Sequence, residues 1–118
     1  MCGIAGFWSN SNDNNGDWLE KTATNMANTL VHRGPDDNGT WVDPEVGIAL
    51  GHRRLSIIDI TGAGHQPMIS KNGRYVISYN GEIYNFQALR IQLEKLGHQF
   101  LGHSDTEVML SSFVQWGV

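Results

Sequence analysis

The chain has a single cysteine, which lies at position 2 directly after the first Met. One cysteine excludes an internal disulfide, so the fold must be held by a hydrophobic core, and 118 residues suit one domain or less. Gly3 to Trp8 is a short apolar run containing two glycines, which is typical of a buried strand. The sequence therefore predicts that Cys2 opens the first strand.

Removal of Met1 would give Cys2 two reactive groups. A cysteine thiol ordinarily has a pKa of about 8.5 and a terminal α-amine one of about 7.7 to 8.0, so nucleophile and base would share one residue. Cys2 is also small enough to allow Met1 to be removed during synthesis. This is the arrangement of an N-terminal nucleophile, which needs no separate His. The alternative for Cys2 alone is a small hydrophobic residue entering the first strand.

The charge pattern gives no sign of a polyanionic partner. The net charge is -4 with acidic and basic residues interspersed, so there is neither a basic stripe for nucleic acid nor a polybasic arm for membranes. The chain also lacks a leader-like n-region and h-region and any apolar run of about 18 residues. We therefore expect no nucleic-acid or membrane partner, and a cytoplasmic location in which the thiol stays reduced.

Short apolar and alternating runs predict the strands. The turn Asp43-Pro44-Glu45 separates two such runs and suggests a hairpin, and Asn72-Gly73 is a second hairpin turn signal. The expected strands are Gly3 to Trp8, Gly39 to Val42, Gly47 to Leu55, Arg74 to Asn80 and His98 to Leu101.

Apolar residues at three- and four-residue steps predict the helices. Asp17 with Glu20, and Ser104 with Glu107, have the spacing of capping boxes, and Asn85 is expected to cap the middle helix. The expected helices run from Trp18 to Val31, from Phe86 to Leu96 and onward from Ser104. HRGPD at 32–36 ends the first helix, and on composition alone it is only a helix stop and turn.

Four motifs occur in order along the chain: Cys2-Gly3-Ile4-Ala5-Gly6, HRGPD at 32–36, RLSIID at 54–59 and NGEIYN at 80–85. With these motifs the chain strongly resembles the glutaminase domain of class II glutamine amidotransferases of the asparagine synthetase type. The resemblance covers essentially the whole sequence. Four motifs in the right order are far more specific than any one of them.

The resemblance implies an α+β, N-terminal-nucleophile fold: a four-layer αββα sandwich in which two antiparallel sheets lie between helices. Residues 1–118 would be the first, larger part of that domain, truncated at its C-terminal end. We expect the later strands and an ATP-using synthetase domain to lie outside this chain.

The same resemblance implies how glutamine would be hydrolysed. Cys2 would attack the side-chain carboxamide, and the resulting oxyanion would be held by the side-chain amide of Asn80 and the backbone N–H of Gly81. An amide NH₂ and an exposed N–H are the fixed donors that such a site uses. Taken alone, Asn80-Gly81 remains open to interpretation as a simple turn.

The two charged ends of the substrate need opposite charges. By resemblance, Arg54 binds the α-carboxylate with its planar fork, whereas Arg53 should point the other way along the strand and face solvent. Asp105, in the first turn of the last helix, would bind the α-ammonium. The alternative for Asp105 is a plain first-turn acid.

Backbone groups around Ile57 and Ile58, and of Glu82, would complete the pocket, although Glu82 could equally be a surface charge. No cofactor or metal is expected in this chain. The five His residues show no metal-ligand spacing, and we expect them in loops and at the surface: His32, His52, His65, His98 and His103. Gly62-Ala63-Gly64 lacks the Lys-Ser/Thr of a phosphate loop, so ATP and Mg would belong to the synthetase domain.

Two other functions stay open. One is an amidotransferase acting on another acceptor, such as a surface-polysaccharide sugar, since the hydrolysis step is shared and the acceptor would be chosen outside this chain. The other is a non-catalytic module of the same fold, which would be expected to lose Cys2, Arg54, Asn80 or Asp105, and all four are present. The expected partners are glutamine and the C-terminal synthetase domain of the same parent chain, and a homodimer is left open.

Overall fold

The computed structural model describes residues 1–11, 13–57 and 59–118. The chain forms two compact units. The first contains Met1–Leu55, His65–Pro67 and Ser78–Asn80, and the second contains Ser56–Gly64, Met68–Ile77 and Gly81–Val118. Each unit is therefore assembled from segments that are far apart in the sequence.

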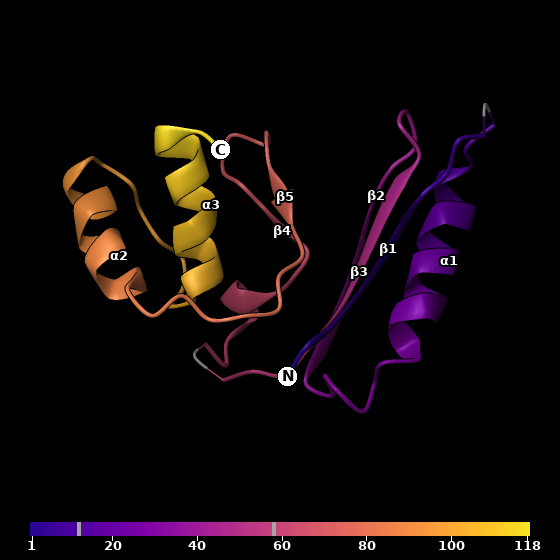
Figure 1. Cartoon of the computed structure of the whole chain (residues 1–118), viewed down its shortest axis with the longest axis horizontal. Coiled ribbons are helices and arrows are strands. Elements are labelled where there is room, and N and C mark those ends of the chain that lie inside the picture. Colours follow the sequence, from indigo (N-terminus) through magenta and orange to yellow (C-terminus); the bar gives the residue numbers. More distant parts are fainter. Residues whose placement is uncertain (12, 58) are drawn as a thin grey trace. The chain divides into compact units, whose positions relative to one another are not determined.

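The first unit is a three-stranded antiparallel sheet with one helix on it (Figure 1). Its strands are β1 (Gly3–Trp8), β2 (Asp37–Asp43) and β3 (Ile48–Arg54), in the order β1-β3-β2. The helix α1 (Gly16–Asn28) covers one face. The expected first strand and the expected hairpin are confirmed, and β3 is the central strand.

The core of the first unit lies between α1 and the sheet. Leu19 and Ala23 of α1 pack on Ala49 of β3, all fully buried, and Phe7 and Val42 from the neighbouring strands extend the cluster. Because side chains alternate along a strand, the opposite face of β3 carries Ile48, Leu50, His52 and Arg54.

Two details of α1 differ from the sequence-based expectation. The cap is Asn15, whose Oδ1 accepts the backbone N–H groups of Asp17 at 2.9 Å and Trp18 at 3.4 Å, so the capping box predicted at Asp17 is wrong. The helix also ends at Asn28 rather than Val31. After Asn28 the chain continues in turns whose hydrogen bonds span three residues instead of four, such as that from the Leu30 N–H to the Ala27 carbonyl at 2.9 Å.

The HRGPD turn packs against the end of β3 through Arg53. Arg53 does lie on the opposite face from Arg54, but the prediction that it faces solvent is wrong, because it is only 9% exposed. Its Nε donates to the Gly34 carbonyl at 2.9 Å. A Cβ at Gly34 would lie 2.6 Å from the backbone N of Arg54 and closer still to the Arg53 carbonyl. Glycine is thus required by the close approach of turn and strand.

The second unit contains the remaining regular elements. A two-stranded antiparallel sheet pairs β4 (Met68–Ile69) with β5 (Val76–Ile77), and a 3-10 helix covers Gly62–Gly64. The helices α2 (Phe86–Lys95) and α3 (Asp105–Trp116) pack side by side (Figure 1). Leu93 of α2 and Val108 of α3 are fully buried in this unit.

Two predicted strands are corrected by the structure. The strand expected from Arg74 to Asn80 is reduced to β5, and residues 98–101 form no strand. Here the His98 N–H donates to the Leu93 carbonyl at 3.0 Å, and side chains bind other backbone groups. Glu107 accepts the N–H groups of Leu101 at 2.6 Å and of the following Gly102 at 3.0 Å, and Lys71 donates to the Gln99 carbonyl.

The caps of the last two helices also differ from one another. Ser104 caps α3 as expected, accepting the Glu107 N–H at 3.2 Å. The Asn85 cap predicted for α2 is wrong, because that side chain makes no cap hydrogen bond. Gly97, with φ of 96°, follows α2 as the expected stop.

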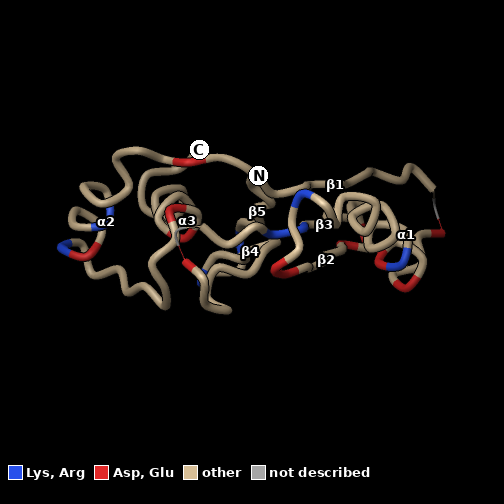
Figure 2. Tube along the Cα trace, turned by 90° about the horizontal axis from the view of Figure 1, so that it is seen from below, with Lys and Arg blue, Asp and Glu red and all other residues tan. Residues whose placement is uncertain are grey.

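The described chain is thus an α+β structure with antiparallel sheets. Basic and acidic residues occur together on both α1 and α2, so neither helix presents one sign alone (Figure 2). Within the described ranges, no helix combines the length and the apolar character needed to cross a membrane.

Candidate active site

The residues predicted to form the site divide between the two units. The first unit holds Cys2, Arg54 and Asn80, and the second holds Ile57, Gly81, Glu82 and Asp105. Ile58, also predicted at the site, lies outside the described residues.

The Cys2 thiol lies at the end of the central strand. The backbone N–H of Leu55 donates to its Sγ at 3.2 Å, and Sγ is 3.6 Å from the Leu55 carbonyl oxygen. An N–H directed at sulfur stabilises negative charge that develops there. Cys2 is half-buried and Met1, attached to it, is exposed, so in this form the Cys2 nitrogen is a peptide amide. The thiol is therefore positioned by the strand end, while the free amine would require loss of Met1.

Arg54, the last residue of β3, immediately precedes the residue that contacts the thiol. It is 7% exposed, and its carbonyl accepts the Asp36 N–H at 3.0 Å. Its partner in the ladder is Asp37 of β2. The expected carboxylate-binding Arg is thus held on the sheet face away from α1.

The backbone before Asn80 is held by two side chains. Residues 78–80 lie outside regular strand structure. The Tyr79 N–H donates to Oε1 of Gln66 at 2.6 Å, and the Tyr79 carbonyl is 3.1 Å from Nε2 of His52. A carbonyl only accepts, so Nε2 of His52 carries the proton and donates.

His52 was expected in a loop or at the surface, which is wrong, because it is fully buried on β3. Burial lowers the pKa of His52 below its ordinary value of 6.5; the Tyr79 carbonyl and Asp37 act in the opposite direction, whereas Arg54 and His65 lower it further. The buried neutral form agrees with the Nε2–H tautomer. The signal that could have revealed its place is the alternation of β3, which puts His52 on the face of Arg54.

In the second unit, Asp105 fixes the loop that follows Asn80. Its carboxylate Oδ2 accepts the Ile83 N–H at 2.9 Å, and the side chain is 5% exposed in the first turn of α3. Gly81 and Glu82, immediately before Ile83, are exposed. Asp105 is therefore more than a surface acid at a helix start. Ile57 is 62% exposed, and its side chain offers no evidence of a binding role.

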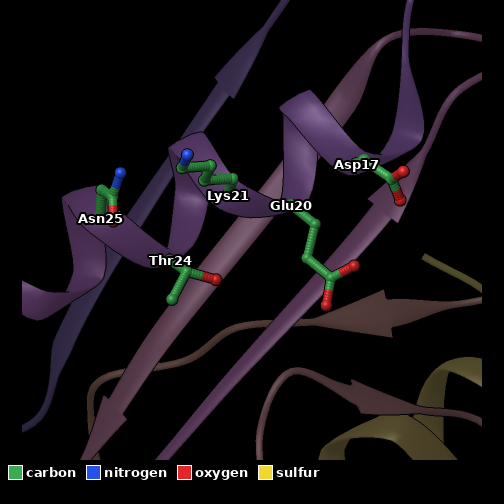
Figure 3. Close-up of a pocket in the computed structure, with 5 residues that line it drawn as sticks. All are labelled: Asp17, Glu20, Lys21, Thr24 and Asn25. Carbon is green, nitrogen blue, oxygen red and sulfur yellow. The ribbon is translucent and has the colours of Figure 1, made fainter.

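Among the described residues, an alternative site could be formed by a metal-ligand cluster or by a hollow. Nowhere in residues 1–11, 13–57 and 59–118 do three His, Cys, Asp or Glu side chains come together as metal ligands. A hollow on α1 is lined by Asp17, Glu20, Lys21, Thr24 and Asn25, side chains of a single helix (Figure 3). None of these five belongs to the predicted site.

Comparison with known proteins identifies the family. A family model for the glutamine amidotransferase domain matches residues 1–118. Asparagine synthetase [glutamine-hydrolyzing] 3 of Bacillus subtilis is 43% identical over 98% of this chain and 18% of its own length. Asparagine synthetase B [glutamine-hydrolyzing] of Escherichia coli is 38% identical over 99% of the chain and 20% of its own length.

A third relative is named an amidase rather than an asparagine synthetase. Amidase chry2 of Gibberella zeae is 33% identical over 100% of this chain and 18% of its own length. The chain therefore spans a fifth or less of the length of each of these three relatives. The match over all 118 residues shows that the chain belongs to the glutamine amidotransferase domain family.

Proposed function

We propose that this chain is the glutamine-hydrolysing part of an asparagine synthetase. The observation that carries the proposal is the whole-length similarity to glutamine-hydrolysing asparagine synthetases, in a chain whose Cys2 thiol is held at a strand end by the Leu55 N–H. A thiol next to an N-terminal amine is suited to attack on a carboxamide.

In the proposed reaction, the Cys2 sulfur bonds to the side-chain carbonyl carbon of glutamine. The thiol proton passes to the α-amine, which exists only once Met1 is removed. The oxyanion accepts hydrogen bonds from the side-chain amide of Asn80 and the N–H of Gly81. The amine then protonates the leaving nitrogen, the C–N bond breaks to release ammonia, and water hydrolyses the thioester to glutamate.

The amino-acid end of glutamine would be bound by Arg54 and Asp105. The guanidinium suits the α-carboxylate and the carboxylate suits the α-ammonium, with backbone groups of Glu82 and the segment that begins at Ile57 completing the pocket. Arg54 is 7% exposed and Asp105 is 5% exposed, so both charged side chains lie inside the protein rather than at its surface.

The proposal places the chain in a larger assembly. Residues 1–118 would be the first part of a four-layer αββα domain, whose later strands and synthetase domain come from the rest of the parent chain. ATP and Mg would act in that synthetase domain, where ammonia amidates aspartate. The relatives support this picture, because the matched segment is a fifth or less of their length. A cytoplasmic location is part of the proposal, since the thiol must stay reduced.

A second candidate is an amidotransferase that delivers ammonia to another acceptor, and it is kept because one relative, Amidase chry2, is not named an asparagine synthetase. The hydrolysis step would be unchanged, because its residues lie in the matched segment. Assaying the complete protein with glutamine, ATP and a panel of carboxylate acceptors separates the two candidates. Amidation of aspartate supports the first, and amidation of a different acceptor alone supports the second.

The hydrolysis itself is tested on the complete protein that contains residues 1–118. Protein with Met1 removed and protein with Met1 retained are prepared, each N-terminus is verified by mass spectrometry, and glutamate release is measured. We expect activity only in the processed form, and none after Cys2→Ala, while ammonia-dependent synthesis persists in that variant.

Equal rates with and without Met1 would show that the Cys2 amine is not the base. Glutamate release by Cys2→Ala would contradict the assignment of the nucleophile. Folded, processed protein that releases no glutamate would favour a non-catalytic module of the same fold.

A further inference from the structure

The backbone of Tyr79 is held by side chains rather than by a strand partner. Its N–H donates to Gln66 Oε1 at 2.6 Å and its carbonyl accepts from His52 Nε2 at 3.1 Å. Both side chains are buried, His52 fully and Gln66 to 7% exposure. The proposed reaction gives neither of them a role.

These two hydrogen bonds restrain two successive peptide planes. A peptide unit is planar, so holding the Tyr79 carbonyl also holds the nitrogen and Cα of Asn80. The Tyr79 N–H belongs to the preceding plane, which Gln66 holds. The only soft backbone torsions between these planes are φ and ψ of Tyr79. The position of Asn80 therefore depends on contacts made by its neighbour.

The two holding side chains are themselves anchored to the sheet. His52 lies on the central strand, with Ile4 and Gly39 as its ladder partners. The Gln66 segment lies against Gly39, where a Cβ would come within 2.6 Å of the His65 ring and closer still to the Gln66 carbonyl. His65 Nδ1 is 2.6 Å from the Asp37 carboxylate. The support for Tyr79 is thus built on β2 and β3.

We propose that His52 and Gln66 are positioning residues that hold the two peptide planes on either side of the Tyr79 Cα and thereby orient the Asn80 amide toward the oxyanion. The inference rests on the proposed glutamine hydrolysis and adds residues outside the four motifs. Neither residue touches the reacting atoms in this role. The tautomer is set by the contact itself, because a carbonyl can only accept and Nε2 must therefore carry a proton.

The test compares His52→Gln with His52→Met in the complete, processed protein. The two replacements have similar length, but only Gln can donate to the Tyr79 carbonyl from the position of Nε2. We expect His52→Met to lower kcat for glutamate release by about 10-fold to 10²-fold, the cost of a small misplacement of a catalytic group, with KM for glutamine nearly unchanged. His52→Gln should restore most of the loss. Equal kcat in the two variants would overturn the role of this hydrogen bond.

A double-mutant cycle with Asn80→Ala separates positioning from a general structural effect. If His52 acts through Asn80, His52→Met should cost little further kcat in the Asn80→Ala background. The same fold loss in both backgrounds would overturn the proposal. Circular dichroism establishes that each variant is folded. If His52→Met does not fold, Gln66→Met tests the other hydrogen bond by the same cycle.

The outcome is distinguishable from failure of the proposed function. If Cys2→Ala has no effect on glutamate release, the nucleophile assignment fails whatever the cycle gives. If Cys2→Ala abolishes release but the cycle is additive, hydrolysis stands and only the positioning role fails.

Discussion

Gly34→Ala is a substitution for which the structure predicts a clear structural defect. An added Cβ would lie 2.6 Å from the Arg54 nitrogen, and closer to the Arg53 carbonyl, against an ordinary contact of at least 3.4 Å. The shortfall is about 0.8 Å at the Arg54 nitrogen and larger at the Arg53 carbonyl, and it must be met by moving backbone. Arg53 and Arg54 are paired in the central strand, Arg53 with both neighbouring strands, so the turn that contains Gly34 must move instead.

The expected cost follows from that movement. Overpacking costs about 1 to 3 kcal/mol, and weakening the charged Arg53 Nε hydrogen bond to the Gly34 carbonyl adds up to about 1.5 to 3 kcal/mol. Reduced flexibility of the unfolded chain offsets about 0.4 to 1 kcal/mol. We expect a net loss of roughly 2 to 4 kcal/mol in the free energy of unfolding, which corresponds to a fall of roughly 10 °C or more in Tm for a domain of about this size.

The assay is thermal unfolding followed by circular dichroism, with Gly62→Ala as the matched control. A Cβ at Gly62 has no atom within 4 Å, apart from its chain neighbours, so the same chemical change meets open space there. KM for glutamine should also rise in Gly34→Ala, because the turn is bonded to Arg54 through the Asp36 N–H. Equal Tm values for the two variants would refute the argument from close approach.

Two further predictions concern single charged or titrating groups. Asp105→Asn keeps an oxygen for the Ile83 N–H but loses the negative charge, so KM for glutamine should rise about 10-fold to 10²-fold with an unchanged Tm; an unchanged KM would remove Asp105 from the site. Burial depresses the pKa of His52 in the folded protein, so the unfolded chain protonates this residue more readily. The free energy of unfolding should therefore decrease as the pH falls below 6.5. Tm measured from about pH 8 to about pH 5 should fall less steeply in His52→Gln than in the unmodified protein, and parallel curves would contradict this.

The sequence correctly predicted those helices and strands whose signals lie within a few neighbouring residues. The apolar run after Cys2 is β1, and the Ser104 signal starts α3 where expected. The helical periodicity of α2 predicted its start at Phe86, although Asn85 contributes no side-chain cap. These elements depend on contacts within a few residues or on a single buried face, which a sequence displays directly.

The errors arose where side chains replace backbone partners. Residues 78–80 have the alternation of a strand, yet the Tyr79 peptide is bonded to Gln66 and His52. Residues 98–101 were also expected to form a strand, but Glu107 takes two of the local N–H groups. Such partners are distant in sequence or arise from a turn geometry that no periodic pattern records.

The roles of the candidate residues were predicted from motifs, whereas their physical setting came only from the structure. Alternation separated Arg53 from Arg54 correctly, but it could not show that the HRGPD turn covers Arg53. The motifs likewise gave no reason for the burial of His52. Sequence patterns therefore supplied the residues that we propose to face the chemistry, and they missed side chains such as His52 that hold the neighbouring backbone.

The end of β3 carries two neighbouring groups, the proposed substrate-binding side chain and the N–H that contacts the proposed nucleophile. Arg54, proposed to bind the substrate carboxylate, is followed directly by Leu55, whose N–H donates to the Cys2 sulfur at 3.2 Å. Because consecutive peptide planes share a Cα, a shift of this strand end moves both groups together. Perturbations of the Gly34 turn should therefore change kcat and KM jointly, whereas loss of the Asp105 charge, in the second unit, should change KM alone. The two perturbations should differ in their effect on kcat because Arg54 adjoins the backbone that contacts Cys2, whereas Asp105 lies at the start of α3.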